Sequence, residues 1–313
     1  MKRLRFIVLS LMLILSNHGL CFAQAVAASG EPAWVAYAKG LKELNAKNYG
    51  QALYYLKAAI QTARVMPEAE LALGDLYFLQ GDYLLAERQY LKAWEEQLAF
   101  QVPDEKYQAL YRLARLYKLK KDFAKYETTL QKIVAAEPLF SDKLNAFFKD
   151  NLKRLYINKG FDEAFKLNRM DEGFATEAFA ELAWFYYRSY RFEYALDFSL
   201  YSVIPILSEA MKEIRANFSG YQYTTLSDFF KQALSITYIK DYLAERNIYS
   251  RLYYLALNSY ELIKTRDIGI YLLNILASLV EAGDYQRLAR AQLAKPFREK
   301  SIEAELNPKR SLE

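Results

Sequence analysis

Histidine and cysteine supply most catalytic bases, nucleophiles and zinc ligands in proteins, and each occurs once in this chain of 313 residues. His18 and Cys21 both lie within the first 25 residues, which have the pattern of an export signal. Removal of that signal would leave a chain with neither residue. Such a chain could not use thiol catalysis, a Ser-His pair or the common zinc sites.

Carboxylates remain as candidates for acid and base chemistry. Adjacent acids in a helix point in different directions, so they are poorly placed to act together on one substrate. The sequence contains neither a glycine-rich phosphate loop nor a Gly-x-Ser-x-Gly elbow. We therefore expect no enzyme, no metal and no cofactor. The adjacent acids are Glu95-Glu96, Asp104-Glu105, Asp162-Glu163 and Asp171-Glu172.

Residues 1–25 are predicted to be a signal peptide. Three basic residues are followed by an apolar run from Phe6 to Leu15, about half the roughly 20 residues of a membrane span, and then by small residues suited to cleavage near Ala23 or Ala25. We expect export, most simply to a bacterial periplasm. A lipid anchor on Cys21 is the alternative, although the preceding Leu20 is larger than lipoprotein signals favour.

Cleavage after Ala23 would lower the formal net charge from +5 to +2, because it removes three basic residues and no acidic ones. A chain so close to neutral gives no electrostatic reason to expect a nucleic-acid partner. Without cysteine, its stability must come from buried apolar area alone. Aromatic residues make up 16% of the chain and supply large side chains for such a core.

Helical periodicity begins at Trp34, and glycine is sparse, so the elements are expected to be helices. One pattern recurs at an offset of 34 residues: Gly40, Tyr49, Ala52 and Ala59 return as Gly74, Tyr83, Ala86 and Ala93. A period of this length indicates a stacked array of helix hairpins. In the second repeat, small residues at Gly74 and Ala86 allow two helices to approach, and Gly81 and Asp82 form the turn between them.

These residues resemble the tetratricopeptide repeat. The first repeat has Lys47 where glycine is usual at the turn. The third keeps Leu113, Ala114, Asp122 and Phe123, but it has Tyr126 at a small position and begins late, after an insertion near 97–104. Fainter echoes follow at Gly160, at Tyr186 and at Gly283.

The resemblance implies an all-α fold, a right-handed α-solenoid of stacked antiparallel hairpins with a divergent helical C-terminal half. The expected organisation is a signal peptide over 1–25 and three repeats over 26–138. Divergent hairpins follow over 139–203, a helical region or cap over 204–300, and a polar tail over 301–313.

In this family the first helix of each hairpin lines a concave surface, so the resemblance also implies a peptide-binding groove. The groove would begin aromatic and become basic, which suits a peptide or helix with apolar anchors and an acidic part. Tyr37 and Leu41 stand where chaperone-binding members hold a C-terminal carboxylate, so that mode is not expected. The groove residues would be Trp34, Tyr37, Leu41, Leu44, Leu71, Asp75, Phe78, Leu79, Tyr111, Arg112, Arg115, Lys118, Trp184, Tyr187 and Arg188.

The function expected from these observations is a protein-protein interaction scaffold of the bacterial cell envelope, without catalysis. Its partner would be a peptide or helix of an envelope protein, and a basic cluster from Arg112 to Lys125 leaves contact with a membrane surface open. Two alternatives stand beside it: a self-associating structural component, and an enzyme with a carboxylate pair within 204–313. The sequence does not give the oligomeric state.

Overall fold

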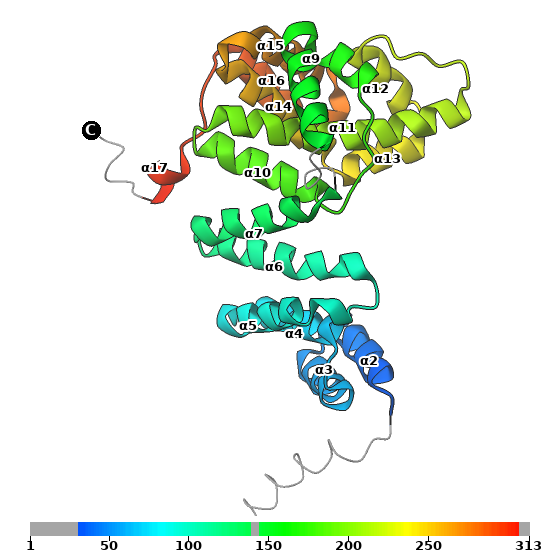
Figure 1. Ribbon diagram of the computed structural model, residues 1–313, viewed down its shortest axis with the longest axis vertical. Helices are drawn as coiled ribbons and strands as arrows, with labels where there is room; N and C mark the ends of the chain where they lie inside the picture. Colours follow the sequence, from blue (N-terminus) through cyan, green and yellow to red (C-terminus); the bar gives the residue numbers. More distant parts are fainter. Residues whose placement is uncertain (1–30, 139–143, 307–313) are drawn as a thin grey trace, which may run out of the picture. The chain divides into compact units, whose positions relative to one another are not determined.

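The computed structural model describes residues 31–138 and 144–306 (Figure 1). This part contains fifteen α-helices and no strand, and consecutive helices pack as hairpins. The solenoid-like, all-α class predicted from the sequence is confirmed. The predicted signal peptide, with His18 and Cys21, lies outside the described residues.

The chain divides into two compact units, Met1–Leu116 and Tyr117–Glu313. The division falls inside one helix, and it coincides with neither of the boundaries at 138 and 203 expected from the repeats. Among the helices of the described residues, none is long and apolar enough to cross a membrane.

Unit 1 is built from two complete hairpins, α2 with α3 and α4 with α5, followed by two short 3₁₀ turns and most of a further helix. The 3₁₀ turns lie in the predicted insertion, where Phe100 is buried. The elements are α2 (Ala33–Asn45), α3 (Tyr49–Ala63), α4 (Pro67–Leu79), α5 (Tyr83–Glu95), η1 (Gln97–Ala99), η2 (Pro103–Glu105) and α6 (Lys106–Leu119).

Two glycines set the close approach of the helices in these hairpins. A Cβ on Gly40 would lie 2.7 Å from a methyl carbon of Leu56, and one on Gly74 would lie 2.5 Å from the ring of Tyr90. Leu56 and Tyr90 are both fully buried. The sequence-based explanation of Gly74 as a contact point between helices is confirmed.

The hairpin turns share one backbone geometry whatever residue occupies them. Gly81 has a φ of 81°, and Lys47, Lys121 and Tyr190, at the same place in their own hairpins, have φ values between 57° and 61°. At each turn, two backbone amides donate to carbonyls of the preceding helix. The missing glycine at Lys47 therefore leaves the turn geometry unchanged.

Unit 2 contains the remaining helices (Figure 1). α10 pairs with α11, α11 packs on α14, and α14, α15 and α16 follow one another in contact. The elements are α7 (Phe123–Ala136), α9 (Leu144–Leu167), α10 (Thr176–Arg188), α11 (Phe192–Asn217), α12 (Leu226–Leu234), α13 (Thr237–Glu245), α14 (Ile248–Glu261), η3 (Ile263–Thr265), α15 (Arg266–Ser278), η4 (Val280–Ala282), α16 (Asp284–Ala294) and α17 (Ile302–Leu306).

The faint sequence echoes of unit 2 fall at a bend, in a hairpin and at a turn. Gly160 interrupts α9 with a φ of 83°. The echo at Tyr186 lies in the α10/α11 hairpin, and Gly283, with a φ of 55°, lies at the turn before α16. The region near 204–264, whose repeats the sequence did not define, contains the second half of α11 and helices α12 to α14.

The segment predicted to be a polar tail, 301–313, begins with a short helix. Residues 302–306 form α17, and the side chain of Ile302 is only 6% exposed. An apolar residue with a helical spacing to Leu306 gives this short segment a side that can pack on other helices. The rest of the predicted tail lies outside the described residues.

Candidate functional site

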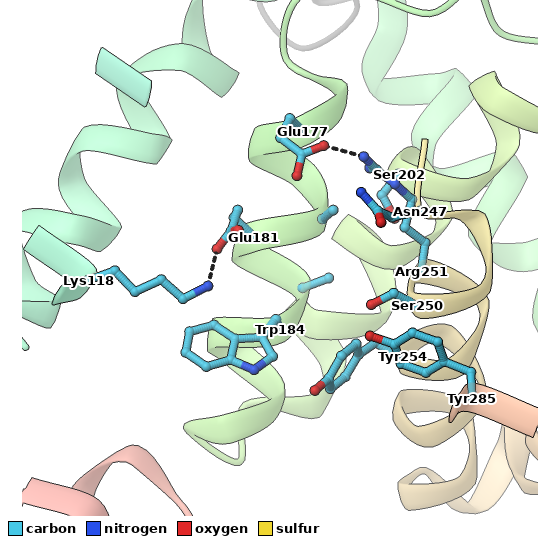
Figure 2. A pocket seen from close by; sticks show the side chains of 12 residues that line it. Lys118, Glu177, Glu181, Trp184, Ser202, Asn247, Ser250, Arg251, Tyr254 and Tyr285 are labelled. Carbon is cyan, nitrogen blue, oxygen red and sulfur yellow. Dashed lines mark hydrogen bonds and ion pairs between the residues drawn. The ribbon is translucent and has the colours of Figure 1, made fainter. Parts of the chain in front are cut away.

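Unit 2 holds a recess of about 310 Å³ between α10 and α14 (Figure 2). Its lining combines aromatic rings with charged and hydroxyl-bearing side chains. The lining residues are Lys118, Glu177, Ala180, Glu181, Ala183, Trp184, Ser202, Asn247, Ser250, Arg251, Tyr254 and Tyr285. We call this recess the α10 pocket.

One wall of the α10 pocket is an aromatic platform. Glu181 and Trp184 lie three residues apart on α10, so both face the same side of the helix. The Lys118 ammonium lies 3.9 Å from the centre of the Trp184 ring and 2.6 Å from a carboxylate oxygen of Glu181. The Arg188 guanidinium lies 5.6 Å from the centre of the same ring. Two cations therefore border a half-buried indole.

The opposite wall is organised by Arg251 of α14, whose residue exposure is 5%. Its guanidinium donates to the backbone oxygens of Thr176 and Arg246, at 2.9 and 2.8 Å, and forms an ion pair with Glu177. A buried arginine needs this many acceptors, because an unpaired charge would be costly away from water. Arg251 thus joins α14 to the start of α10.

The floor of the α10 pocket includes Tyr254 and Tyr285. The Tyr254 hydroxyl donates to the carboxylate of Glu299 at 3.1 Å. Burial, reinforced by that carboxylate, raises the pKa of Tyr254 above its ordinary value of 10.0. The phenol therefore stays protonated at neutral pH and acts as a hydrogen-bond donor.

This arrangement is suited to binding. Its four charged groups form two ion pairs, Lys118 with Glu181 and Arg251 with Glu177 (Figure 2). In the described residues, no group of three or more acids or other ligating side chains is placed to hold a metal ion. What the pocket offers a ligand is an aromatic face and polar groups around it.

In unit 1, the predicted groove residues of α2 serve mainly as core. Tyr37, Leu41 and Leu44 are half-buried and pack against a buried cluster formed by α3 and α4. Trp34, by contrast, is 64% exposed. Leu71 is buried, which contradicts its predicted place on an open surface: α4 is covered on more than one side, as a helix inside a stack must be.

The later groove residues of unit 1 form a closed polar cluster. The carboxylate of Asp75 accepts from Arg112 at 2.7 Å and from the Tyr90 hydroxyl at 2.9 Å. The Arg115 guanidinium lies 4.6 Å from the centre of the Phe78 ring. These side chains do come together, and the charges of Asp75 and Arg112 are paired with each other. Leu79 is exposed and Tyr111 half-buried in the same unit.

In unit 2, the structure brings Lys118 and Trp184 together in the lining of the α10 pocket, and Arg188 lies beside the Trp184 ring. Tyr187 is 1% exposed and packs against the rings of Phe192 and Tyr254, so its assignment to the groove is wrong. It lies on the side of α10 that α11 and α14 cover.

Sequence reasoning missed the residues of the α10 pocket that α14 and α16 supply. It also missed Glu177 and Glu181, for which a signal exists: together with Trp184 and Arg188 they form a stripe at spacings of three and four residues on α10. The basic cluster found in the sequence is largely paired, since Lys118 binds Glu181, Lys121 binds Glu305 and Lys125 binds Asp122.

A comparison with models of known protein families finds no match. The chain is similar to an uncharacterised protein of Treponema pallidum (strain Nichols), with 27% identity over 206 residues. The similarity covers 63% of this chain and 53% of the relative, so the chain spans about half of that protein's length.

Proposed function

We propose that this protein is a non-catalytic interaction module of the tetratricopeptide-repeat kind, exported to a bacterial envelope, which binds a segment of a partner protein at the α10 pocket. The observation that carries the proposal is the half-buried Trp184 ring, which lines the recess and has two cations close to it. Tryptophan and arginine are the side chains most enriched among residues that dominate protein-protein binding.

The size of the α10 pocket favours a polypeptide over a free small molecule. A volume of about 310 Å³ lies at the lower end of the range of roughly 300 to 1,000 Å³ for sites that enclose a whole ligand. A recess of this size is suited to one anchoring side chain of a longer segment. Its internally paired charges give orientation and selectivity more than affinity.

The charges around Trp184 also define the chemistry of the partner segment. Lys118 and Arg188 border the ring, and the carboxylates of Glu177 and Glu181 lie on the same helix. A segment with an aromatic or apolar anchor and polar groups of both signs would be complementary to this wall. The anchor would stack on the indole, and its flanking groups would meet the rim.

The test is site-specific photo-crosslinking from position 180, where Ala180 lines the α10 pocket, in cells that produce the protein. We expect one partner segment to be captured and mapped by mass spectrometry, and its synthetic copy to bind the purified protein. Trp184→Ala should weaken that binding by about 30-fold, as for an aromatic residue worth about 2 kcal/mol.

Trp34→Ala is the matched control, because it removes the same side chain from an exposed position of unit 1. It should leave capture and affinity unchanged. Equal capture by a folded Trp184→Ala protein would refute the proposal. Capture of a second copy of this chain would replace it with the self-association alternative.

A further inference from the structure

A segment of this chain lies on the surface beside the α10 pocket. Residues 296–306, here called the strap, leave α16 without regular structure and end in α17 (Figure 1). The start of the strap is fixed by Gln292, whose side chain exchanges two hydrogen bonds with the backbone of Phe297, at 2.7 and 3.0 Å. Arg298 then forms an ion pair with Glu261 of α14.

The middle of the strap is held through its backbone and through the side chain of Glu299. Arg188 donates to the carbonyl oxygen of Lys300, and the Tyr190 hydroxyl donates to that of Glu299 at 3.4 Å. The Glu299 carboxylate accepts from Tyr254 of the α10 pocket. Because Arg188 also borders the Trp184 ring, the strap and the pocket share residues at their common edge.

The end of the strap is recognised by its side chains. Ile302 is buried, and together with Leu306 it lines a hollow of about 380 Å³ whose other side includes Phe123 of α7 and Phe185 of α10. The Glu305 carboxylate lies 2.9 Å from Arg188 and 3.2 Å from Lys121. The strap therefore presents an apolar residue, an acid three positions later and a second apolar residue at the fourth.

The contacts of α17 hold the end of the strap weakly enough to be released. A helix of five residues has almost no stability of its own. Exposed ion pairs such as that of Lys121 and Glu305 contribute about 0 to 1 kcal/mol each. Leu306 is still 44% exposed. One buried isoleucine carries most of the apolar contact.

We propose that the surface of α7 and α10 that holds the strap is a recognition surface for partner peptides of the strap's own chemistry, apolar-x-x-acidic-apolar, and that the strap is a built-in competitor which a partner must displace. This inference rests on the proposed function, since it adds a second contact to the segment bound at the α10 pocket. Displacement would also free Tyr254 in that pocket and Arg188 beside the Trp184 ring.

The size of the competition follows from tethering. A short flexible connection gives the strap an effective concentration of the order of 1 mM at the surface. If the free strap peptide binds with a Kd of about 100 µM, the ratio of docked to undocked strap is about ten to one. An external peptide would then bind the closed protein about tenfold more weakly than a protein whose strap is disengaged.

The experiment uses the full chain after removal of its predicted signal, and a fluorescent peptide with the sequence of residues 299–306. The double variant Ile302→Asp and Glu305→Arg is designed to disengage the strap, and faster tryptic cleavage after Arg298 and Lys300 shows that it has done so. We expect the peptide to bind this variant at least fivefold more tightly than it binds the unaltered protein, by fluorescence anisotropy. A peptide carrying the same two changes should not bind.

Adding Arg188→Ala to the disengaged variant should abolish binding, because Arg188 contacts both the backbone and the acid of the bound segment. The inference is overturned if the disengaged variant, with its strap cleaved rapidly, binds the peptide no better than the unaltered protein. That result leaves the proposed function standing if the partner captured from position 180 still depends on Trp184. If capture of the partner does not depend on Trp184 while the peptide binds as expected, the α10 pocket is refuted as a binding site and the strap surface is retained.

Discussion

Replacement of Gly74 by alanine should destabilise unit 1, although alanine is the better helix former. The added Cβ would lie 2.5 Å from Cε1 and 2.6 Å from Cδ1 of Tyr90, far inside van der Waals contact. The ring cannot retreat freely, because it is fully buried and its hydroxyl donates to Asp75. Either α4 and α5 separate or the ring moves and that hydrogen bond is lost.

The expected magnitude combines three contributions. Alanine in place of glycine inside a helix contributes about 1 kcal/mol of stability. Overpacking of a tight contact costs about 1 to 3 kcal/mol, and loss of the Tyr90–Asp75 hydrogen bond costs about 1 kcal/mol more. The net change in the free energy of unfolding should therefore be a loss of about 1 to 3 kcal/mol.

The assay is urea denaturation followed by circular dichroism, with Gly50→Ala as the control. A Cβ on Gly50 would meet nothing within 4 Å, so this change should be neutral or stabilising by up to about 1 kcal/mol. The double variant Gly74→Ala and Tyr90→Leu should lose less stability than the sum of the two single changes, because leucine removes the ring atoms that clash with the added Cβ. A Gly74→Ala protein at least as stable as the unaltered chain would refute the explanation of this glycine by close approach.

Three further predictions concern the turn geometry, the buried arginine and the strap. Lys47→Gly should stabilise the protein by about 0.5 kcal/mol in thermal unfolding. The strain of a residue with a Cβ at a φ of 61° is larger than the entropy that glycine loses on folding. Gly81→Ala should have the opposite effect. Arg251→Met should cost about 2 to 3 kcal/mol in urea denaturation by leaving buried carbonyls without a donor, whereas Arg287→Met, which removes an exposed ion pair, should cost less than about 0.5 kcal/mol. Lys121 and Arg188 hold the pKa of Glu305 below its ordinary value of 4.5. The contribution of that carboxylate to strap docking is therefore complete above pH 4.5 and is lost as the pH falls through the lower pKa of the folded protein. Hydrogen exchange of residues 299–306, normalised to the free peptide, should rise as the pH falls through this range, and it should rise less in Glu305→Gln.

The regular hairpins were predictable because single residues in them have one clear steric or hydrogen-bonding role. Gly40 and Gly74 lie opposite large side chains, and Asp82 caps the following helix by accepting from the amide of Leu85. The turn at Lys47 could not be predicted from its residue type. The turn needs a positive φ, and the hydrogen bonds around the turn impose it on a residue that does not favour it.

The groove was only partly predictable, because periodicity says which residues share a face and not what covers that face. Tyr187 and Trp184 are three residues apart on α10, yet one is buried and the other half-exposed. The difference arises from α14, a helix more than 60 residues further along the chain. Arg251, Tyr254 and Tyr285 could not be assigned to the α10 pocket, since their place depends on how α14 and α16 pack.

The pairing of charges also bears on how affinity and selectivity divide at the α10 pocket. A partner acid that binds Lys118 must replace Glu181, and a partner base that binds Glu181 must replace Lys118. Either exchange breaks one ion pair to form another, so its net free energy is small, while a partner of the wrong charge pattern leaves a group unpaired. Affinity must then come from contact with the Trp184 ring and from apolar contacts like that of Ile302 in the strap. Binding of a true partner should accordingly depend weakly on salt and strongly on these apolar positions.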